Sequence, residues 1–171
     1  MKIGIISDTH KKPGRTRRAI ELLVKQGAQA FIHAGDIVME ENLRLLEETA
    51  LPYVAVFGNN DEALLPLATR YPLYQEPSIH TWEGLSFKVM HYPYFLRPAE
   101  TDLIVFGHTH IKAISFDGRT LTLNPGEVCA RDTGRSECML LTVTPERFVV
   151  DAYARPIKTD EWNHERTEFL R

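Results

Sequence analysis

The chain has 171 residues, of which 43% are hydrophobic and 25% charged, which is the ordinary composition of a folded globular protein. Its 20 Lys and Arg stand against 23 Asp and Glu, so the formal charge is -3 and no overall basic field would attract macromolecular nucleic acid or an anionic membrane. No apolar run is long enough for a membrane span or a signal peptide, and we expect a single domain over residues 1–171, located in the cytoplasm.

The first part of the chain alternates strands and helices. Short apolar runs at 2–7, 30–35 and 53–58 predict strands. Each is followed by a segment with helical character, at 16–25, 40–48 and, more briefly, 61–68. Such βα repeats predict a parallel sheet.

After Pro72 the pattern changes to short strands separated by tight turns. These strands are predicted at 78–82, 85–91, 103–108, 112–116, 119–123, 137–143 and 147–154. The polar segment from Arg155 onward is expected to be peripheral. The two parts together predict an α/β fold, a two-sheet β-sandwich flanked by helices.

Polar side chains follow five of the predicted strands, where α/β sheets bind their ligands. Each one alone would more often cap a helix, form a turn or pack in the core. Two of them, His108 and His110, are two residues apart on an extended segment and face the same side. The seven side chains together therefore predict one shared site, formed by Asp8, His10, Asp36, Asn59, His91, His108 and His110.

This set of side chains is typical of a metal centre. Seven ligands are too many for one tetrahedral ion but suit two ions that share a carboxylate, for which Asp36 is the natural bridge. Oxygen and imidazole donors without thiolate argue against copper and iron–sulfur clusters. We expect two divalent metal ions, manganese first, with nickel, zinc, iron, cobalt or magnesium as alternatives.

Five ordered motifs carry a family resemblance: DTH at 8–10, GD at 35–36, GNND at 58–61, His91, and GHTH at 107–110. They resemble the calcineurin-like metallophosphoesterase superfamily. The small size and the NPG at 124–126 look most like its compact bacterial and archaeal phosphodiesterase branch, the YfcE or MJ0936 type. The match covers about residues 1–126.

The resemblance implies a four-layer α/β sandwich and the hydrolysis of small phosphodiesters by a hydroxide that bridges the two metals. It assigns Asp36, as the shared ligand, to both metal sites. The first site is implied to consist of Asp8, His10, Asp36 and His110, and the second of Asp36, Asn59, His91 and His108.

The chain departs from the family pattern at two positions. Many members have a His where this chain has Asn60, and an amide cannot protonate a leaving group, so activated aryl esters should suffer least. After His91 the family often continues Gly-His, whereas this chain has Tyr92-Pro93-Tyr94, which could stack an aromatic group or simply pack. We expect catalytic roles for Asp36, Asn59, Asn60 and His91, and substrate binding by Asn60, Lys11 and Tyr92.

Three further residues are expected to have structural roles. Asp61 is expected to orient Asn60 or a metal ligand, His33 to be a core histidine, and Asn124 to begin a tight turn that closes on the site.

The main functional hypothesis is a dinuclear metal-dependent phosphodiesterase. A phosphomonoesterase or nucleotidase of the same fold is an alternative, and so is a weakly catalytic binding scaffold like the retromer subunit Vps29. The expected partner is a small phosphodiester substrate, and members of this branch commonly form homo-oligomers.

Overall fold

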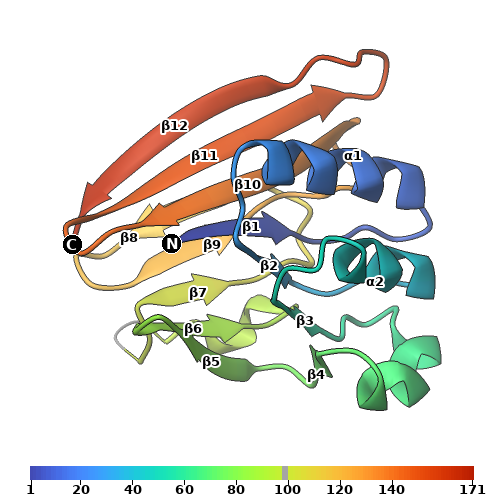
Figure 1. Ribbon diagram of the computed structural model, residues 1–171, viewed down its shortest axis with the longest axis horizontal. Helices are drawn as coiled ribbons and strands as arrows, with labels where there is room; N and C mark the ends of the chain where they lie inside the picture. Colours follow the sequence, from blue (N-terminus) through green and yellow to red (C-terminus); the bar gives the residue numbers. More distant parts are fainter. Residues whose placement is uncertain (98–99) are drawn as a thin grey trace.

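The computed structural model describes residues 1–97 and 100–171 and contains two β-sheets (Figure 1). The larger sheet has seven strands in the order β12-β11-β10-β1-β2-β3-β4. In chain order they are β1 (Lys2–Ile6), β2 (Ala30–His33), β3 (Tyr53–Val56), β4 (Leu73–Tyr74), β10 (Arg135–Val143), β11 (Arg147–Pro156) and β12 (Asn163–Leu170).

The smaller sheet has five strands in the order β5-β6-β7-β9-β8. They are β5 (Ser78–Trp82), β6 (Leu85–Val89), β7 (Leu103–Val105), β8 (Ala113–Phe116) and β9 (Leu121–Asn124). The helices are α1 (Pro13–Lys25) and α2 (Glu40–Glu47), with the 3₁₀ segments η1 (Glu62–Thr69) and η2 (Pro93–Phe95). The predicted α/β fold with two sheets and flanking helices is thus confirmed.

Two groups of buried residues hold these layers together. Ile3 and Ile5 of β1 belong to the core between the sheets, which they share with Phe87 of β6. Ile6 of the same strand belongs to a second core on the opposite face of the larger sheet. Because successive side chains of a strand point to opposite faces, one short apolar run supplies both cores.

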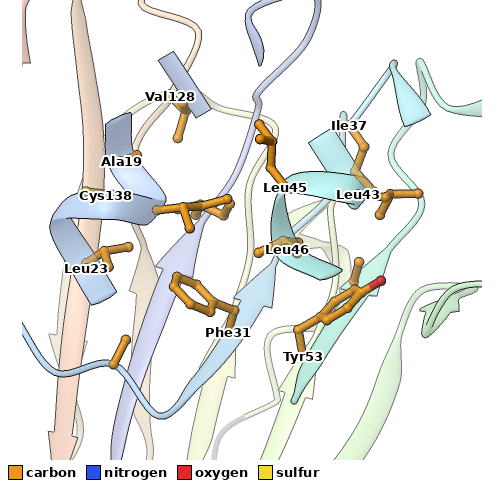
Figure 2. Packing of buried hydrophobic residues seen from close by; sticks show 14 of the residues in the cluster. Ala19, Leu23, Phe31, Ile37, Leu43, Leu45, Leu46, Tyr53, Val128 and Cys138 are labelled. Atoms are coloured by element: carbon orange, nitrogen blue, oxygen red, sulfur yellow. The ribbon is translucent and has the colours of Figure 1, made fainter. Parts of the chain in front are cut away.

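The second core lies under the two α-helices (Figure 2). Leu23 of α1 and Leu46 of α2 are fully buried in it together with Phe31 of β2, and Tyr53 of β3 lies at 7% exposure. Burying such side chains contributes about 1.5–3 kcal/mol each. Their packing fixes α1 and α2 on the outer face of the larger sheet, as Figure 2 shows.

The strand directions explain why polar side chains gather at one edge. Strands β1, β2, β3 and β4 run parallel to one another, as the alternation of strands and helices predicts. In the smaller sheet β6, β7 and β9 are also parallel. The segments that follow these strands therefore leave each sheet on the same side.

The C-terminal segment is peripheral, as predicted, but it also forms a strand that the sequence did not predict. Residues 163–170 form β12, which pairs antiparallel with β11 at the edge of the larger sheet (Figure 1). Most β12 residues are exposed, so the strand lacks the alternation of apolar and polar residues that predicts strands. Phe169 packs against the core between the sheets, and cross-strand pairs such as Arg166 with Asp151 also hold the strand.

Two smaller differences concern the region around Pro66. The short helix predicted at 61–68 is a 3₁₀ helix, and Pro66 lies inside it. A proline in a helix interior removes a hydrogen-bond donor and disfavours the α-helical conformation. The two-residue strand β4 follows, which is too short for periodicity to predict.

None of the helices that the structure describes could cross a bilayer, given their length and polarity.

Candidate metal centre and active site

The candidate site lies where the carboxyl ends of strands from both sheets meet. Asp8, Asp36 and Asn59 follow β1, β2 and β3 of the larger sheet, and His91 and His108 follow β6 and β7 of the smaller one. A ligand at this place would contact both sheets, as is usual at the carboxyl ends of parallel strands.

The structure brings four of the predicted ligands into a first group. The ligand atoms of Asp8, His10, Asp36 and His110 all lie within 4.8 Å of one another. Nε2 of His110 is 3.2 Å from Oδ1 of Asp8, and Nε2 of His10 is 3.5 Å from Oδ2 of Asp36. Except for the partly exposed His10, these residues are buried.

A second group adjoins the first at Asp36. Nε2 of His91 lies 3.5 Å from Oδ1 of Asp36 and 3.1 Å from Oδ1 of Asn59. Nδ1 of His108 lies 3.2 Å from the same Asn59 oxygen. The other ring nitrogen of His91, Nδ1, is 2.9 Å from the carbonyl oxygen of Ala34, so a proton on Nδ1 would leave the lone pair of Nε2 facing the site.

Many of the predicted ligands share an uncommon backbone conformation. Non-glycine residues with positive φ are rare, because their side chains crowd the backbone, and they tend to occur at functional sites. The fold therefore holds these side chains in place at a cost in backbone conformational energy. The residues are Asp8 (φ 52°), His10 (45°), Asp36 (55°), His108 (65°) and His110 (60°).

The glycines of the GNND and GHTH motifs allow the loops to approach one another closely. A Cβ atom on Gly107 would overlap Oγ of Ser7 and come within 2.9 Å of Oδ2 of Asp8. A Cβ atom on Gly58 would overlap the backbone nitrogen and Oδ1 of Asp36. Both positions thus require glycine for steric reasons.

Two buried polar atoms at the centre of the first group have no hydrogen bond within residues 1–97 and 100–171. They are Oδ1 of Asp8 and Nε2 of His10, and Oδ1 of Asp8 lacks hydrogen-bond geometry to His110 despite their proximity. Unpaired buried polar atoms are costly and are rare in folded proteins. Carboxylate and imidazole donors in this arrangement fit a divalent cation.

The pKa of Asp36 is set by its burial and by its neighbours. Burial alone would raise its pKa, but the nearby His91 ring and hydrogen bonds from Asn60 hold the pKa below the usual range. Asn60 donates from its backbone nitrogen to Oδ1 (3.0 Å) and from Nδ2 to Oδ2 (2.7 Å). Burial lowers the pKa of His91, yet Asp36 outweighs this and the net pKa of His91 is raised. Asp36 is therefore ionised at neutral pH.

Asp61 acts on the backbone of the site. Its Oδ2 accepts hydrogen bonds from the backbone nitrogens of Gly58 (2.7 Å) and Ile37 (3.1 Å), and Oδ1 accepts one from Val38 (2.7 Å). It thus ties together the two turns that carry Asp36 and Asn59. The expected orientation of ligands by Asp61 is therefore achieved through these turns.

Glu127 is a site residue that the sequence prediction missed. This fully buried carboxylate has Oε2 2.8 Å from Nδ1 of His110, and its Oε1 accepts hydrogen bonds from the backbone nitrogens of Asp132 (2.8 Å) and Thr133 (2.6 Å). Burial raises its pKa, but hydrogen bonds from Cys129 and Thr133 outweigh this and lower the pKa to about 2. A carboxylate on the second ring nitrogen commonly orients a metal-binding histidine. The only sequence signal is an acidic residue directly after the NPG turn.

The predicted substrate-binding residues lie on the rim. Lys11 is exposed and lines a hollow together with His10 and Asn60. The ring of Tyr92 lies 4.2 Å from that of His108 and stacks on Tyr94 at 4.9 Å, measured between ring centroids. Tyr92 therefore packs against a predicted ligand at the mouth of the site.

The remaining sequence expectations concern structural residues. His33 is fully buried with Nε2 3.0 Å from Oγ1 of Thr9, and burial lowers its pKa to about 3. Asn124 begins the NPG turn and donates from Nδ2 to the carbonyl oxygen of Gly107 (2.9 Å) and to Oγ1 of Thr109 (2.9 Å). It thereby holds the GHTH loop in place.

Comparison with known proteins gives a family match. Residues 1–146 match the family model of the calcineurin-like phosphoesterase superfamily domain. The phosphodiesterase MJ0936 of Methanocaldococcus jannaschii is 30% identical over 146 residues, which cover 78% of this chain and 88% of that protein. The phosphodiesterase YfcE of Escherichia coli K12 is 26% identical over 149 residues, covering 75% of this chain and 79% of that protein.

Among solved structures, vacuolar protein sorting 29 from Cryptosporidium parvum superposes with a TM-score of 0.80 and 19% identity, over 99% of this chain and 98% of that one. This likeness concerns the fold, whereas the sequence relatives are named as phosphodiesterases. The chain belongs to the calcineurin-like metallophosphoesterases, hydrolases of phosphoric esters, and to their compact phosphodiesterase branch.

Proposed function

We propose that the chain is a dinuclear metal-dependent phosphodiesterase that acts on small phosphodiesters. The observation that carries this proposal is the pair of ligand groups that share Asp36, with Oδ2 towards His10 and Oδ1 towards His91. A shared carboxylate between two sets of oxygen and imidazole donors suits two cations. Family membership supports a phosphoric ester as substrate.

The first metal site would consist of Asp8, His10, Asp36 and His110, and the second of Asp36, Asn59, His91 and His108. The unpartnered atoms of Asp8 and His10 support the first of these. Two divalent ions bound there would polarise phosphate oxygens and lower the pKa of a water molecule. Manganese is our first choice, and nickel, zinc, iron, cobalt and magnesium suit the same donors.

Asn60 has a positioning role in this proposal. Its backbone and side-chain nitrogens hold both oxygens of Asp36, which orients the carboxylate that the two groups share. Its amide has no proton to give to a leaving group near neutral pH. Esters with acidic leaving groups, such as nitrophenyl esters, should therefore be hydrolysed faster than alkyl esters.

Hydrolysis by metal-stripped protein supplied with Mn, Ni, Zn or Mg tests the proposal. We expect metal-dependent turnover of bis-p-nitrophenyl phosphate that exceeds turnover of the mononitrophenyl ester. Asp36→Ala should abolish it, and Asp151→Asn, which alters a buried carboxylate on β11, should not.

Other outcomes point to the alternatives. Preference for the monoester would indicate a phosphatase or nucleotidase of the same fold. Absence of turnover with two bound metals per chain would favour a binding scaffold, an alternative supported by the fold similarity to vacuolar protein sorting 29. The expected cytoplasmic location, the homo-oligomer and the single domain over 1–171 stay predictions.

A further inference from the structure

A basic pocket opens directly beside the candidate site. It is a hollow of about 680 Å³, which is the size of a small-molecule site. Two residues of the candidate site and four basic residues form part of its wall. These residues are His10, Asn60, Lys11, Lys12, Arg15 and Arg131.

Most of this positive charge is not neutralised by the protein. Lys11 and Lys12 are exposed and have no ion pair in the described part of the chain. Arg15 donates from its guanidinium to the carbonyl oxygen of Cys129, which fixes the side chain across the pocket without cancelling its charge. Arg131 pairs with Asp132 at 3.1 Å. The pocket thus concentrates cations on a chain whose net charge is -3.

The basic surface continues away from the site. Lys11, Lys12 and Arg15 also line an adjoining hollow, together with Arg18 and Arg155. Arg155 is only 3% exposed, and its Nε has no hydrogen-bond partner among residues 1–97 and 100–171. Its guanidinium donates from Nη1 to the carbonyl oxygen of Thr159 (2.9 Å) and lies over the ring of Trp162, contacts that hold the side chain without neutralising its charge.

We propose that the natural substrate is a small phosphodiester with a second phosphate group, which the basic pocket binds beside the scissile diester. This inference rests on the proposed phosphodiesterase function and adds the substrate class. Several lysine and arginine donors next to one another suit the oxygens and charge of a phosphomonoester. The charge is local, so a small anion suits it better than a long nucleic acid.

Two matched substrates test the inference. Thymidine 5′-(p-nitrophenyl phosphate) and its 3′-phosphorylated counterpart share the scissile bond and the leaving group and differ only in the second phosphate. We expect kcat/KM to be about tenfold higher for the 3′-phosphorylated substrate, mainly through KM, because charge-assisted hydrogen bonds to a phosphate are strong. Higher salt should reduce this ratio.

The double variant Lys11→Gln/Lys12→Gln should reduce the ratio to below about threefold. Arg119→Gln/Arg147→Gln, which removes the same charge from exposed positions outside the pocket, should keep it. Equal kcat/KM for the two substrates in the wild type, or an unchanged ratio in the lysine variant, would overturn the inference.

A binding measurement separates this inference from the proposed function. Titration calorimetry should show that thymidine 3′,5′-bisphosphate binds about tenfold more tightly than thymidine 5′-phosphate, and that the lysine variant loses the difference. Failure to hydrolyse either ester would refute the phosphodiesterase proposal. Equal binding of the two nucleotides would refute the second phosphate site, whatever the activity.

Discussion

The candidate site and the strand cluster of Asp151, His164 and Arg166 both place histidine beside carboxylate, and they differ in how their polar atoms are satisfied. On strands β11 and β12, the buried Asp151 accepts hydrogen bonds from Nε2 of His164 (2.6 Å) and from Nε (2.8 Å) and a terminal nitrogen (3.1 Å) of Arg166. At the candidate site, Asp8 and His10 each keep a buried atom without a partner in the described residues.

The backbone differs as well. The residues of the strand cluster lie on regular paired strands, whereas Asp8 and His10 have positive φ. A cluster whose polar atoms are all paired and that lies on regular strands stabilises the fold. A cluster with unpaired buried atoms on strained loops is suited to binding a ligand. Proximity of histidine and carboxylate therefore does not by itself indicate a metal site.

The largest expected effect is a difference in catalytic activity between a variant of the candidate site and the same substitution in the strand cluster. Asp36→Asn should reduce diester turnover about a thousandfold or more, because the shared ligand loses its charge. Asp151→Asn makes the same chemical change in the strand cluster and should leave turnover within about twofold. Steady-state kinetics with bis-p-nitrophenyl phosphate measures both, and similar losses in the two variants would contradict the comparison.

Glu127→Gln should weaken metal binding about 10–100-fold, because Glu127 orients His110 through Nδ1. Titration calorimetry with Mn²⁺ on metal-stripped protein measures this, with Asp151→Asn as the matched control. Thermal unfolding without metal would show whether the variant is folded. Unchanged affinity in a folded variant would mean that Glu127 only supports the loop after the NPG turn.

The strand cluster should contribute to the free energy of unfolding, and this contribution should depend on pH. Burial raises the pKa of Asp151, but hydrogen bonds from Arg166 and His164 outweigh this, and the net pKa lies below the usual value. The carboxylate thus stabilises the fold above its unfolded pKa of about 4, and this stabilisation is lost as pH falls through the lower folded pKa.

Asp151→Asn should therefore lower the free energy of unfolding by about 1–2 kcal/mol at pH 7, since Arg166 and His164 are partly exposed and solvent screens the pairs. Urea unfolding of both proteins at pH 7 and pH 3 measures the difference, which should shrink at pH 3. A difference that grows in acid would show that the pKa is raised in the folded state.

The smallest effect is expected at the rim of the site. Tyr92→Ala should raise KM for an aromatic diester about two- to tenfold and change KM less for an alkyl diester, if the exposed ring face stacks on substrate. Equal changes for both substrates would instead assign Tyr92 to packing against His108, which its 4.2 Å ring contact also allows.

The sequence predicted most strongly where the signal is local. The runs before Asp8, Asp36 and Asn59 are apolar because both faces of those strands are buried, and the polar residue at each strand end stands out against them. The parallel strands then bring the ends together. This is why the sequence could predict that these side chains gather at one edge of the sheets.

What the sequence did not predict depends on contacts between distant segments. Glu127 contacts His110, which is 17 residues away in the sequence, and no sequence periodicity predicts this contact. Strand β12 is an edge strand with mostly polar, exposed residues, so only its pairing with β11 identifies it. The basic pocket brings Arg131 beside Lys11 and Lys12, which are remote from it in the chain.

The left-handed backbone of the ligand loops also has an evolutionary consequence. Replacing His10 with glycine would relieve the conformational cost of positive φ and would remove a buried ring nitrogen that has no hydrogen-bond partner in the described residues. A lineage released from selection for catalysis could therefore lose this ligand without losing stability. The β-sandwich would survive this loss, because its two cores do not depend on His10.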